Sequence, residues 1–151
     1  MWALNQPQQS GVFGQPDCRK YEVPTCEADV NVAPNATVPA IATFTIKQRD
    51  TIDFTVDWSS WLGANGNPVL TNATWTVATD SPKTPTISGQ AFSAAGVCVA
   101  VLTPAAGATP GDAYWLDLTV TVGVTTATNA GDVAIPARTL VRRVYIIVTA
   151  G

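Results

Sequence analysis

The sequence predicts an all-β fold: an immunoglobulin-like antiparallel β-sandwich of about seven strands, preceded by an extended N-terminal arm. Three observations predict it. From residue 41 onward, apolar and polar residues alternate with a period of two nearly everywhere. The alternating segments are separated by turn sequences such as GANGNP and TPAAGATPGD. No segment in this region carries the apolar stripe of an amphipathic helix.

The first 40 residues differ from the rest. They contain five of the eleven prolines, and no strand or helix period survives between them. We therefore divide the chain into an arm, residues 1–40, and a sandwich domain, residues 41–151. Trp2, Phe13 and Tyr21 are the candidate anchors of this arm. They either fold back onto the domain or bind along a partner protein, and we favour the partner.

The alternation predicts seven strands, near residues 42–47, 51–58, 73–79, 84–90, 96–102, 112–122 and 138–150. The second places Phe54, Val56 and Trp58 inside, with Asp53 and Asp57 on a solvated outer face. The spacing suits a sandwich, although the antibody-type pattern of two cysteines around a core tryptophan is missing. A jelly roll is the competing all-β architecture, but it usually has one more strand.

Composition argues against several classes of function. Only 13% of the residues are charged, about half the usual share, and the net charge is −3. Because a nucleic-acid binder needs clustered Lys and Arg, we expect no nucleic-acid partner. The chain contains no histidine, the side chain best suited to proton transfer and metal binding at neutral pH. We therefore expect no enzyme, no cofactor and no metal site.

The acidic group around Asp53 and Asp57 does not change that expectation. These two carboxylates lie roughly 13 Å apart along one strand, too far to flank a single bond. Their spacing also does not give the converging oxygens that calcium requires.

The N-terminus lacks a basic stretch followed by an apolar run, and no segment is long and apolar enough for a membrane helix. We expect the protein to be synthesised in a bacterial cytoplasm and to have no association with a membrane. Free thiols are then the expectation for Cys18 and Cys26, although a disulfide between them is conceivable in an oxidising exterior. Cys98, inside a strand pattern, is expected to be a small core residue.

Five residues are candidates for surface contacts. Trp61 follows the second strand and is expected to pack over the end of the sandwich, whereas Trp115 lies on the polar face of a strong strand. Arg138, Arg142 and Arg143 gather on the last strand. They either form salt bridges with aspartates of a neighbouring strand or contact an acidic partner subunit.

Residues 47–78 also carry a resemblance to a known family. The stretch RDTIDFTVDWSSWLG, followed by ATWTV, resembles small immunoglobulin-like virion proteins of tailed bacteriophages. The matching positions in this chain are Asp50, Asp53, Phe54, Val56, Asp57, Trp58, Leu62, Thr74, Trp75 and Val77. The motif consists of core and turn residues. The later strands match the family only in the spacing of their strands and turns. The arm and the long loops at 79–95 and 103–112 depart from its compact form.

The resemblance implies a structural protein of a tailed phage particle, present in many symmetric copies and bound to other virion proteins. We expect it in the tail, as an adaptor that joins fibres to the tail connector through its N-terminal arm. Head decoration, with the arm clamped to the capsid, is the close alternative. The alternative of another class is a carbohydrate-binding or adhesin-like module that uses Trp115 and Trp61.

Overall fold

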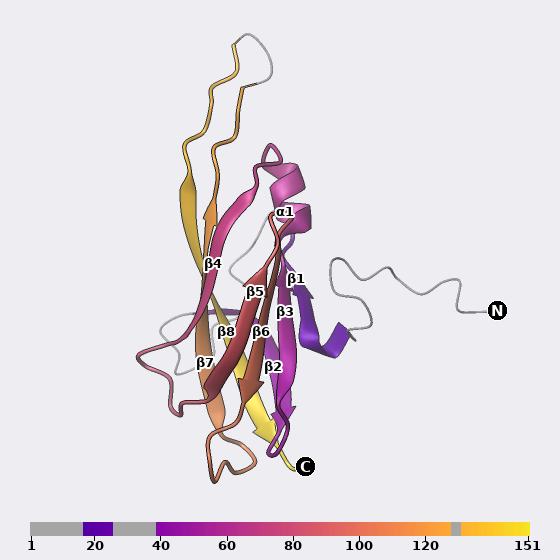
Figure 1. Cartoon of the computed structure of the whole chain (residues 1–151), viewed down its shortest axis with the longest axis vertical. Coiled ribbons are helices and arrows are strands. Elements are labelled where there is room, and N and C mark those ends of the chain that lie inside the picture. Colours follow the sequence, from indigo (N-terminus) through magenta and orange to yellow (C-terminus); the bar gives the residue numbers. More distant parts are fainter. Residues whose placement is uncertain (1–16, 26–38, 128–130) are drawn as a thin grey trace, which may run out of the picture.

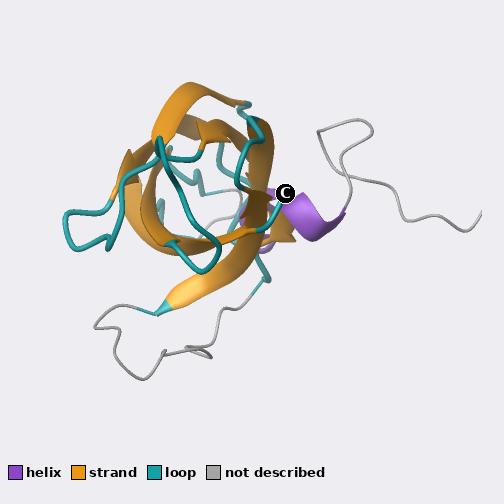
Figure 2. Ribbon diagram, turned by 90° about the horizontal axis from the view of Figure 1, so that it is seen from below, coloured by secondary structure: helices purple, strands orange, loops and turns teal. Residues whose placement is uncertain are grey.

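The computed structural model describes residues 17–25, 39–127 and 131–151, which fold as a β-sandwich of two four-stranded sheets. The first sheet has the order β1-β3-β6-β5 and the second has the order β2-β8-β7-β4. Figure 1 shows the two sheets, and Figure 2 shows them from below, curved around the core like a nearly closed ring. The strands are β1 Lys20–Glu22, β2 Ala40–Lys47, β3 Ile52–Asp57, β4 Leu70–Val77, β5 Thr86–Phe92, β6 Val97–Thr103, β7 Ala113–Val122 and β8 Arg138–Thr149.

The predicted immunoglobulin-like sandwich is confirmed. If β2 to β8 are lettered A to G, one sheet holds B, E and D, and the other holds C, F and G. The first of these strands, β2, joins the second sheet and pairs in parallel with the last strand, β8. The remaining pairs among these seven strands are antiparallel.

The N-terminal part of the chain supplies an eighth strand that the sequence did not suggest. The short 3₁₀ helix η2, Asp17–Arg19, leads into β1, which pairs in parallel with β3. Tyr21 packs against the core, and Val23 is fully buried, with its N–H donated to the carbonyl of Asp57 at 2.8 Å. Residues 17–25 therefore belong to the sandwich and not to an arm. The rest of the predicted arm, residues 1–16 and 26–38, lies outside the described residues.

The core follows the predicted alternation. Alternate residues of β7, from Tyr114 to Val122, are fully buried, as are Val144 and Ile146 of β8. Between the sheets, the rings of Phe44 and Phe54 stack with centroids 5.1 Å apart. The side chains of Trp58 and Trp75 belong to the same core and are almost completely buried. This packed interior joins the two sheets in one core.

A side-chain amide closes one side of the sandwich between β4 and β5. The Oε1 atom of Gln90 accepts a hydrogen bond from the N–H of Trp75 at 2.8 Å, and its Nε2 donates to the carbonyl of Trp75 at 3.1 Å. Gln90 thus substitutes for a neighbouring strand at the edge of β4, where an unpaired backbone would otherwise face solvent. This bridge links the two sheets through one residue.

We expect Gln90→Glu to destabilise the domain by about 1 kcal/mol at neutral pH, since a carboxylate cannot donate to the carbonyl of Trp75. The deficit relative to the unsubstituted protein should shrink below about pH 4, where the introduced carboxyl group is protonated and can donate again. Urea unfolding of both proteins from pH 3 to 7 measures this. Gln90→Ala, which loses both bonds, is the control and should show a deficit that does not change with pH.

Cys98 is a core residue, as predicted. Its side chain is fully buried in the strand β6, and burial, followed by the nearby charge of Asp57, raises the pKa of the thiol to about 12. Cys18 is exposed, and both thiols are free. Cys26 lies outside the described residues.

We therefore expect iodoacetamide at pH 8 to modify Cys18 in the native protein and to leave Cys98 unmodified, because the thiolate is the reactive form. Peptide mapping by mass spectrometry distinguishes the two sites. Unfolding in urea should make Cys98 react at the rate of an ordinary thiol. Equal rates at Cys18 and Cys98 in the native protein would contradict the buried position.

Candidate interaction surfaces

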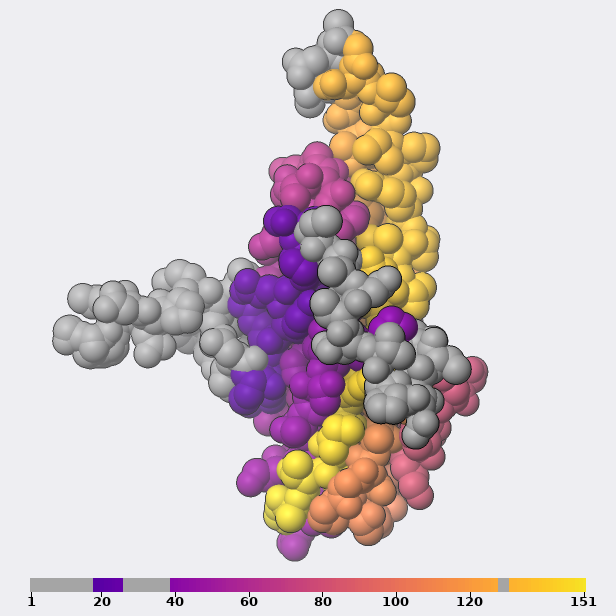
Figure 3. Space-filling model, turned by 180° about the vertical axis from the view of Figure 1, so that it is seen from behind, coloured from indigo at the N-terminus to yellow at the C-terminus, as the bar shows by residue number. Residues whose placement is uncertain are grey.

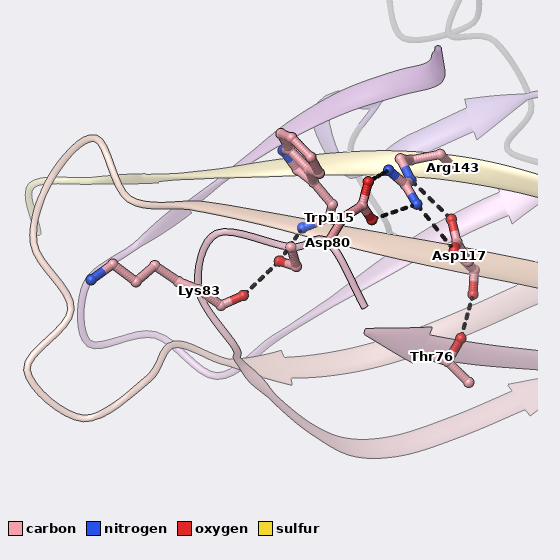
Figure 4. A network of polar contacts seen from close by, with 7 residues as sticks. Thr76, Asp80, Lys83, Trp115, Asp117 and Arg143 are labelled. Atoms are coloured by element: carbon pink, nitrogen blue, oxygen red, sulfur yellow. Dashed lines mark hydrogen bonds and ion pairs between the residues drawn. The ribbon is translucent and has the colours of Figure 1, made fainter. Parts of the chain in front are cut away.

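The outer face of the second sheet carries an ion-pair network around Arg143. The Nε atom of Arg143 lies 3.0 Å from Oδ1 of Asp117, and its Nη1 lies 3.0 Å from Oδ2 of Asp80. Figure 4 shows the guanidinium held between the two carboxylates, one from β7 and one from the turn after β4. Its central carbon lies 5.6 Å from the centre of the Trp115 ring. The side chain of Arg143 is only 5% exposed, so it is a structural residue and not an available contact for a partner.

This network makes stability depend on pH. The hydrogen bond from Arg143 lowers the pKa of Asp80. The hydrogen bonds that Arg143 donates raise the pKa of Arg143, and the bond to Asp117 has a larger effect than the bond to Asp80. Asp112 also has a lowered pKa, chiefly because it accepts the N–H of Thr109 at 3.0 Å. A carboxyl group whose pKa is lower in the folded state stabilises the fold above its unfolded pKa, near 3.9. That contribution disappears as the pH falls through the folded pKa.

We therefore expect the free energy of unfolding to be nearly constant between pH 7 and pH 5 and to fall below about pH 4. Urea denaturation across this range measures it. Asp80→Asn should flatten part of the acid decline, since the introduced amide can still accept a bond from Arg143 without titrating. Asp112→Asn tests separately how much Asp112 contributes to the acid decline. An acid decline that neither replacement reduces would contradict this assignment.

Arg138 and Arg142 also make contacts within the fold. Their guanidinium carbons lie 5.6 Å from the Trp61 ring and 5.5 Å from the Trp58 ring, respectively. Trp61 belongs to the short helix α1, Ser59–Ala64, and its ring meets the ring of Trp58 edge-on at 5.7 Å. Each arginine thus stacks on an aromatic face at one end of the sandwich. Trp61 packs over this end, as the sequence predicted.

Trp115 lies where the sequence placed it, on the outer face of β7, and is half-buried. It sits opposite Tyr145 of β8, with ring centroids 5.6 Å apart and planes tilted by 36°. Together with Arg143, these rings form a small aromatic face on the second sheet. This face is the part of the described surface that could stack on a sugar ring.

The acidic stretch of β3 differs from the prediction at one position. Asp53 is partly exposed and lies 3.6 Å from Arg19, but Asp57 is buried, with 1% of its surface exposed. The Oδ1 atom of Asp57 accepts the N–H of Ser59 at 2.9 Å, at the start of α1. The prediction that Asp57 faces solvent is therefore wrong, because its carboxylate fixes the helix that follows.

The most prominent surface feature is a hairpin that extends β7 and β8 beyond the rest of the sandwich. We call residues 123–137 the hairpin arm; Figure 1 and Figure 3 show it projecting past α1. Its two sides are joined by a bridge between Thr125 and Ile135, whose backbone groups exchange hydrogen bonds of 2.9 Å. Residues 128–130, near its end, lie outside the described residues.

The base of the hairpin arm is fastened to α1. The hydroxyl of Thr125 accepts a hydrogen bond from Arg138 at 3.0 Å and donates to the carbonyl of Asn65 at 3.3 Å. Thr125 is 8% exposed, and a Cβ on Gly66 would collide with its methyl group. Arg138 itself stacks on Trp61. The arm is therefore held in a fixed direction at its base.

The hairpin arm carries half of the six large apolar side chains that the described residues expose. Val133 is 83% exposed, Val124 is 56% exposed and Ile135 is 40% exposed. Val69, just before β4, is 55% exposed and touches the base of the arm, where its carbonyl accepts the N–H of Gly123. Phe92 and Val141 are the other two large apolar side chains that the described residues expose. A set of exposed apolar side chains on an arm with a fixed base is typical of a protein–protein contact.

The described residues contain no cluster of His, Cys, Asp and Glu side chains that could hold a metal ion. Among the described helices, none is long and apolar enough to cross a membrane. The proposed anchors Trp2 and Phe13 lie outside the described residues, whereas Tyr21 packs on the core, because β1 adds to the first sheet. In comparisons with family models, with curated proteins and with solved structures, no significant match was found.

Proposed function

We propose that this protein is a structural component of a tailed bacteriophage particle that works by binding other virion proteins. The observation that carries the proposal is the hairpin arm, an apolar projection with a fixed base on a rigid sandwich. Such a role needs no active-site chemistry, and the described polar clusters are internal ion pairs and stacks. The resemblance of residues 47–78 to small immunoglobulin-like virion proteins supplies the class of particle.

Within the particle, we propose a position in the tail, as an adaptor that joins fibres to the connector. Two parts of the chain would serve that purpose: residues 1–16 at the N-terminus and the hairpin arm. A component with contacts at two places can link two neighbours, as an adaptor must. Head decoration is the alternative position, and both positions require many symmetric copies.

Cryo-electron microscopy of the purified particle tests the proposal. Six or twelve copies around the connector would support the adaptor, and hundreds of copies on the shell would make the protein a decoration protein. Absence from the particle would overturn the virion proposal. The contacts of the hairpin arm would be visible in the same map.

Substitutions test the role of the hairpin arm separately. We design a triple variant, Val124→Thr, Val133→Thr and Ile135→Thr, which removes apolar surface while keeping β-branched side chains. It should keep its thermal unfolding midpoint and lose incorporation into particles at least tenfold. Phe92→Thr, which removes an exposed apolar side chain from β5, is the matched control and should be incorporated normally. Normal incorporation of the triple variant would show that the arm is not the contact.

A second candidate function is carbohydrate binding at Trp115 and Tyr145. Their adjacent rings on the outer sheet face are the observation that favours it. The tilt between the rings and the partial burial of Trp115 make a poor stacking platform, so we rank it below the structural role. A glycan array that retains the unsubstituted protein but not Trp115→Ala would support it, and no retention would dismiss it.

A further inference from the structure

The helix α1 ends in the one asparagine of the sequence that is followed by a glycine. Asn65 caps the C-terminus of α1, and Gly66 follows it with a φ of +88°. Asn65 is half-buried and Gly66 is exposed, so water reaches this turn. Asparagine is among the chemically labile residues of proteins, and a following glycine has no Cβ that would hinder attack on the side-chain amide.

We propose that Asn65 is a site of spontaneous deamidation, and that the product with a lengthened main chain releases the hairpin arm from α1. The backbone nitrogen of Gly66 loses its proton to hydroxide and attacks Cγ of Asn65. The N–Cγ bond forms and the Cγ–Nδ2 bond breaks. Ammonia leaves with a proton taken from water, which restores the hydroxide and gives a five-membered succinimide ring.

Water then opens the ring at one of its two carbonyls. Opening at Cγ gives aspartate with the original main chain. Opening at the main-chain carbonyl gives isoaspartate, in which the chain runs through Cγ and contains one additional methylene group. Water is the one co-reactant, and both products carry a carboxylate in place of the amide at neutral pH.

The native geometry slows the ring closure. The Nδ2 atom of Asn65 donates to the carbonyl of Trp61 at 2.7 Å, one turn earlier in α1. The side-chain amide is therefore directed back along the helix, whereas the nitrogen of Gly66 lies beyond the helix end. Because attack requires the turn to open locally, the rate of deamidation reports how often it opens.

The aspartate and isoaspartate products differ in what they do to the hairpin arm. The hydroxyl of Thr125 donates to the main-chain carbonyl of Asn65 at 3.3 Å. In isoaspartate, this carbonyl becomes part of a carboxylate that branches from the chain. Gly66 also lies so close to Thr125 that a Cβ there would collide with its methyl group, so the turn has no space on this side for a longer main chain.

In the isoaspartate form, the hydroxyl of Thr125 would keep its hydrogen bond from Arg138 and lose its bond to α1. The hairpin arm of an aged molecule would then be less fixed than that of a new one. This inference does not depend on the proposed virion function, and it can be tested on the isolated protein.

Incubation at pH 8 and 37 °C tests the modification site. Peptide mapping, with electron-transfer fragmentation to distinguish isoaspartate from aspartate, should find both products at Asn65. They should form at least tenfold more slowly in the native protein than in a synthetic peptide of residues 61–70. Asn72, which precedes an alanine in β4, is the internal control and should keep its amide.

Two results would overturn this part of the proposal. Equal rates in the protein and the peptide would mean that α1 does not protect the amide. A native protein that keeps Asn65 intact for a hundred times the half-life of the peptide would mean that the site does not react in the folded chain.

Hydrogen exchange tests the release of the hairpin arm. The aged fraction carries an additional negative charge, so ion-exchange chromatography isolates it, and peptide mapping measures its isoaspartate content. The variant Asn65→Asp is the matched control, because it carries the same charge on an unchanged main chain. The amides of Thr125 and Ile135, which bond across the arm at 2.9 Å, should exchange at least tenfold faster in the isoaspartate form than in Asn65→Asp. Equal exchange in the two forms would overturn the release of the arm.

Discussion

Trp58→Ala is expected to destabilise the domain by about 3–5 kcal/mol, a large share of the stability of a domain of this size. The Trp58 side chain is fully buried and fills the end of the sandwich below α1. Its removal would leave a cavity beneath Trp61 and take away the ring on which Arg142 stacks. Thermal unfolding should show a midpoint lower by roughly 10 °C or more.

Two further variants separate the reasons for this loss. Trp58→Phe keeps an aromatic ring, and it removes an indole N–H that is buried without a hydrogen-bond partner among the described residues. We expect it to cost less than half as much as Trp58→Ala. Trp61→Ala, at a half-buried position, should also cost less. A loss below about 1.5 kcal/mol for Trp58→Ala would contradict the role of Trp58 as the main filler of this end.

The parts of the fold that the sequence predicted are those governed by alternation. In β7, ten consecutive residues alternate between buried and half-buried, and the sequence pattern shows the same period. The core position of Trp58 followed from the same rule, since it continues the inward series of Phe54 and Val56 just beyond the end of β3. Alternation works here because each sheet has one face in a shared core and one face toward solvent.

Elements too short to show a period were missed. The strand β1 has three residues, Lys20–Glu22, and stands between prolines, so nothing in it marks a strand. The helix α1 has six residues, less than two turns, and begins after a carboxylate that accepts the N–H of Ser59. Asp57 was assigned to solvent by alternation alone, although an Asp two residues before a Ser is also typical of a helix start.

The sequence could have shown on which side of the sheet each of the three arginines of β8 lies. Extending the inward series of β8 back from Val144 places Arg142, Leu140 and Arg138 on the core side, toward the tryptophans. Arg143 then falls on the outer face, opposite Asp117. The pairing of Arg143 with Asp80, however, depends on a turn 63 residues away in the chain, and no local pattern predicts it.

One glycine connects the turn before β6 to the start of α1, at the end of the sandwich that Trp58 fills. Gly96, in the turn before β6, has a φ of +116°, and its carbonyl accepts the N–H of Trp58 at 2.9 Å. A Cβ at this position would lie 2.9 Å from the backbone nitrogen of Ser59 and 3.0 Å from the carbonyl carbon of Trp58. Because these are backbone atoms at the start of α1, they cannot move aside as a flexible side chain could.

We therefore expect Gly96→Ala to destabilise the domain by about 2–4 kcal/mol, from backbone strain and displacement of α1 together. Gly111→Ala is the matched control: Gly111 also has a positive φ, +95°, but nothing lies within 4 Å of a Cβ there. It should cost about 1 kcal/mol, the strain alone. Urea unfolding of both variants measures the difference, which gives the cost of moving α1. If the two losses were equal, the close approach of Gly96 to the helix would contribute nothing, and α1 would be free to shift relative to β6.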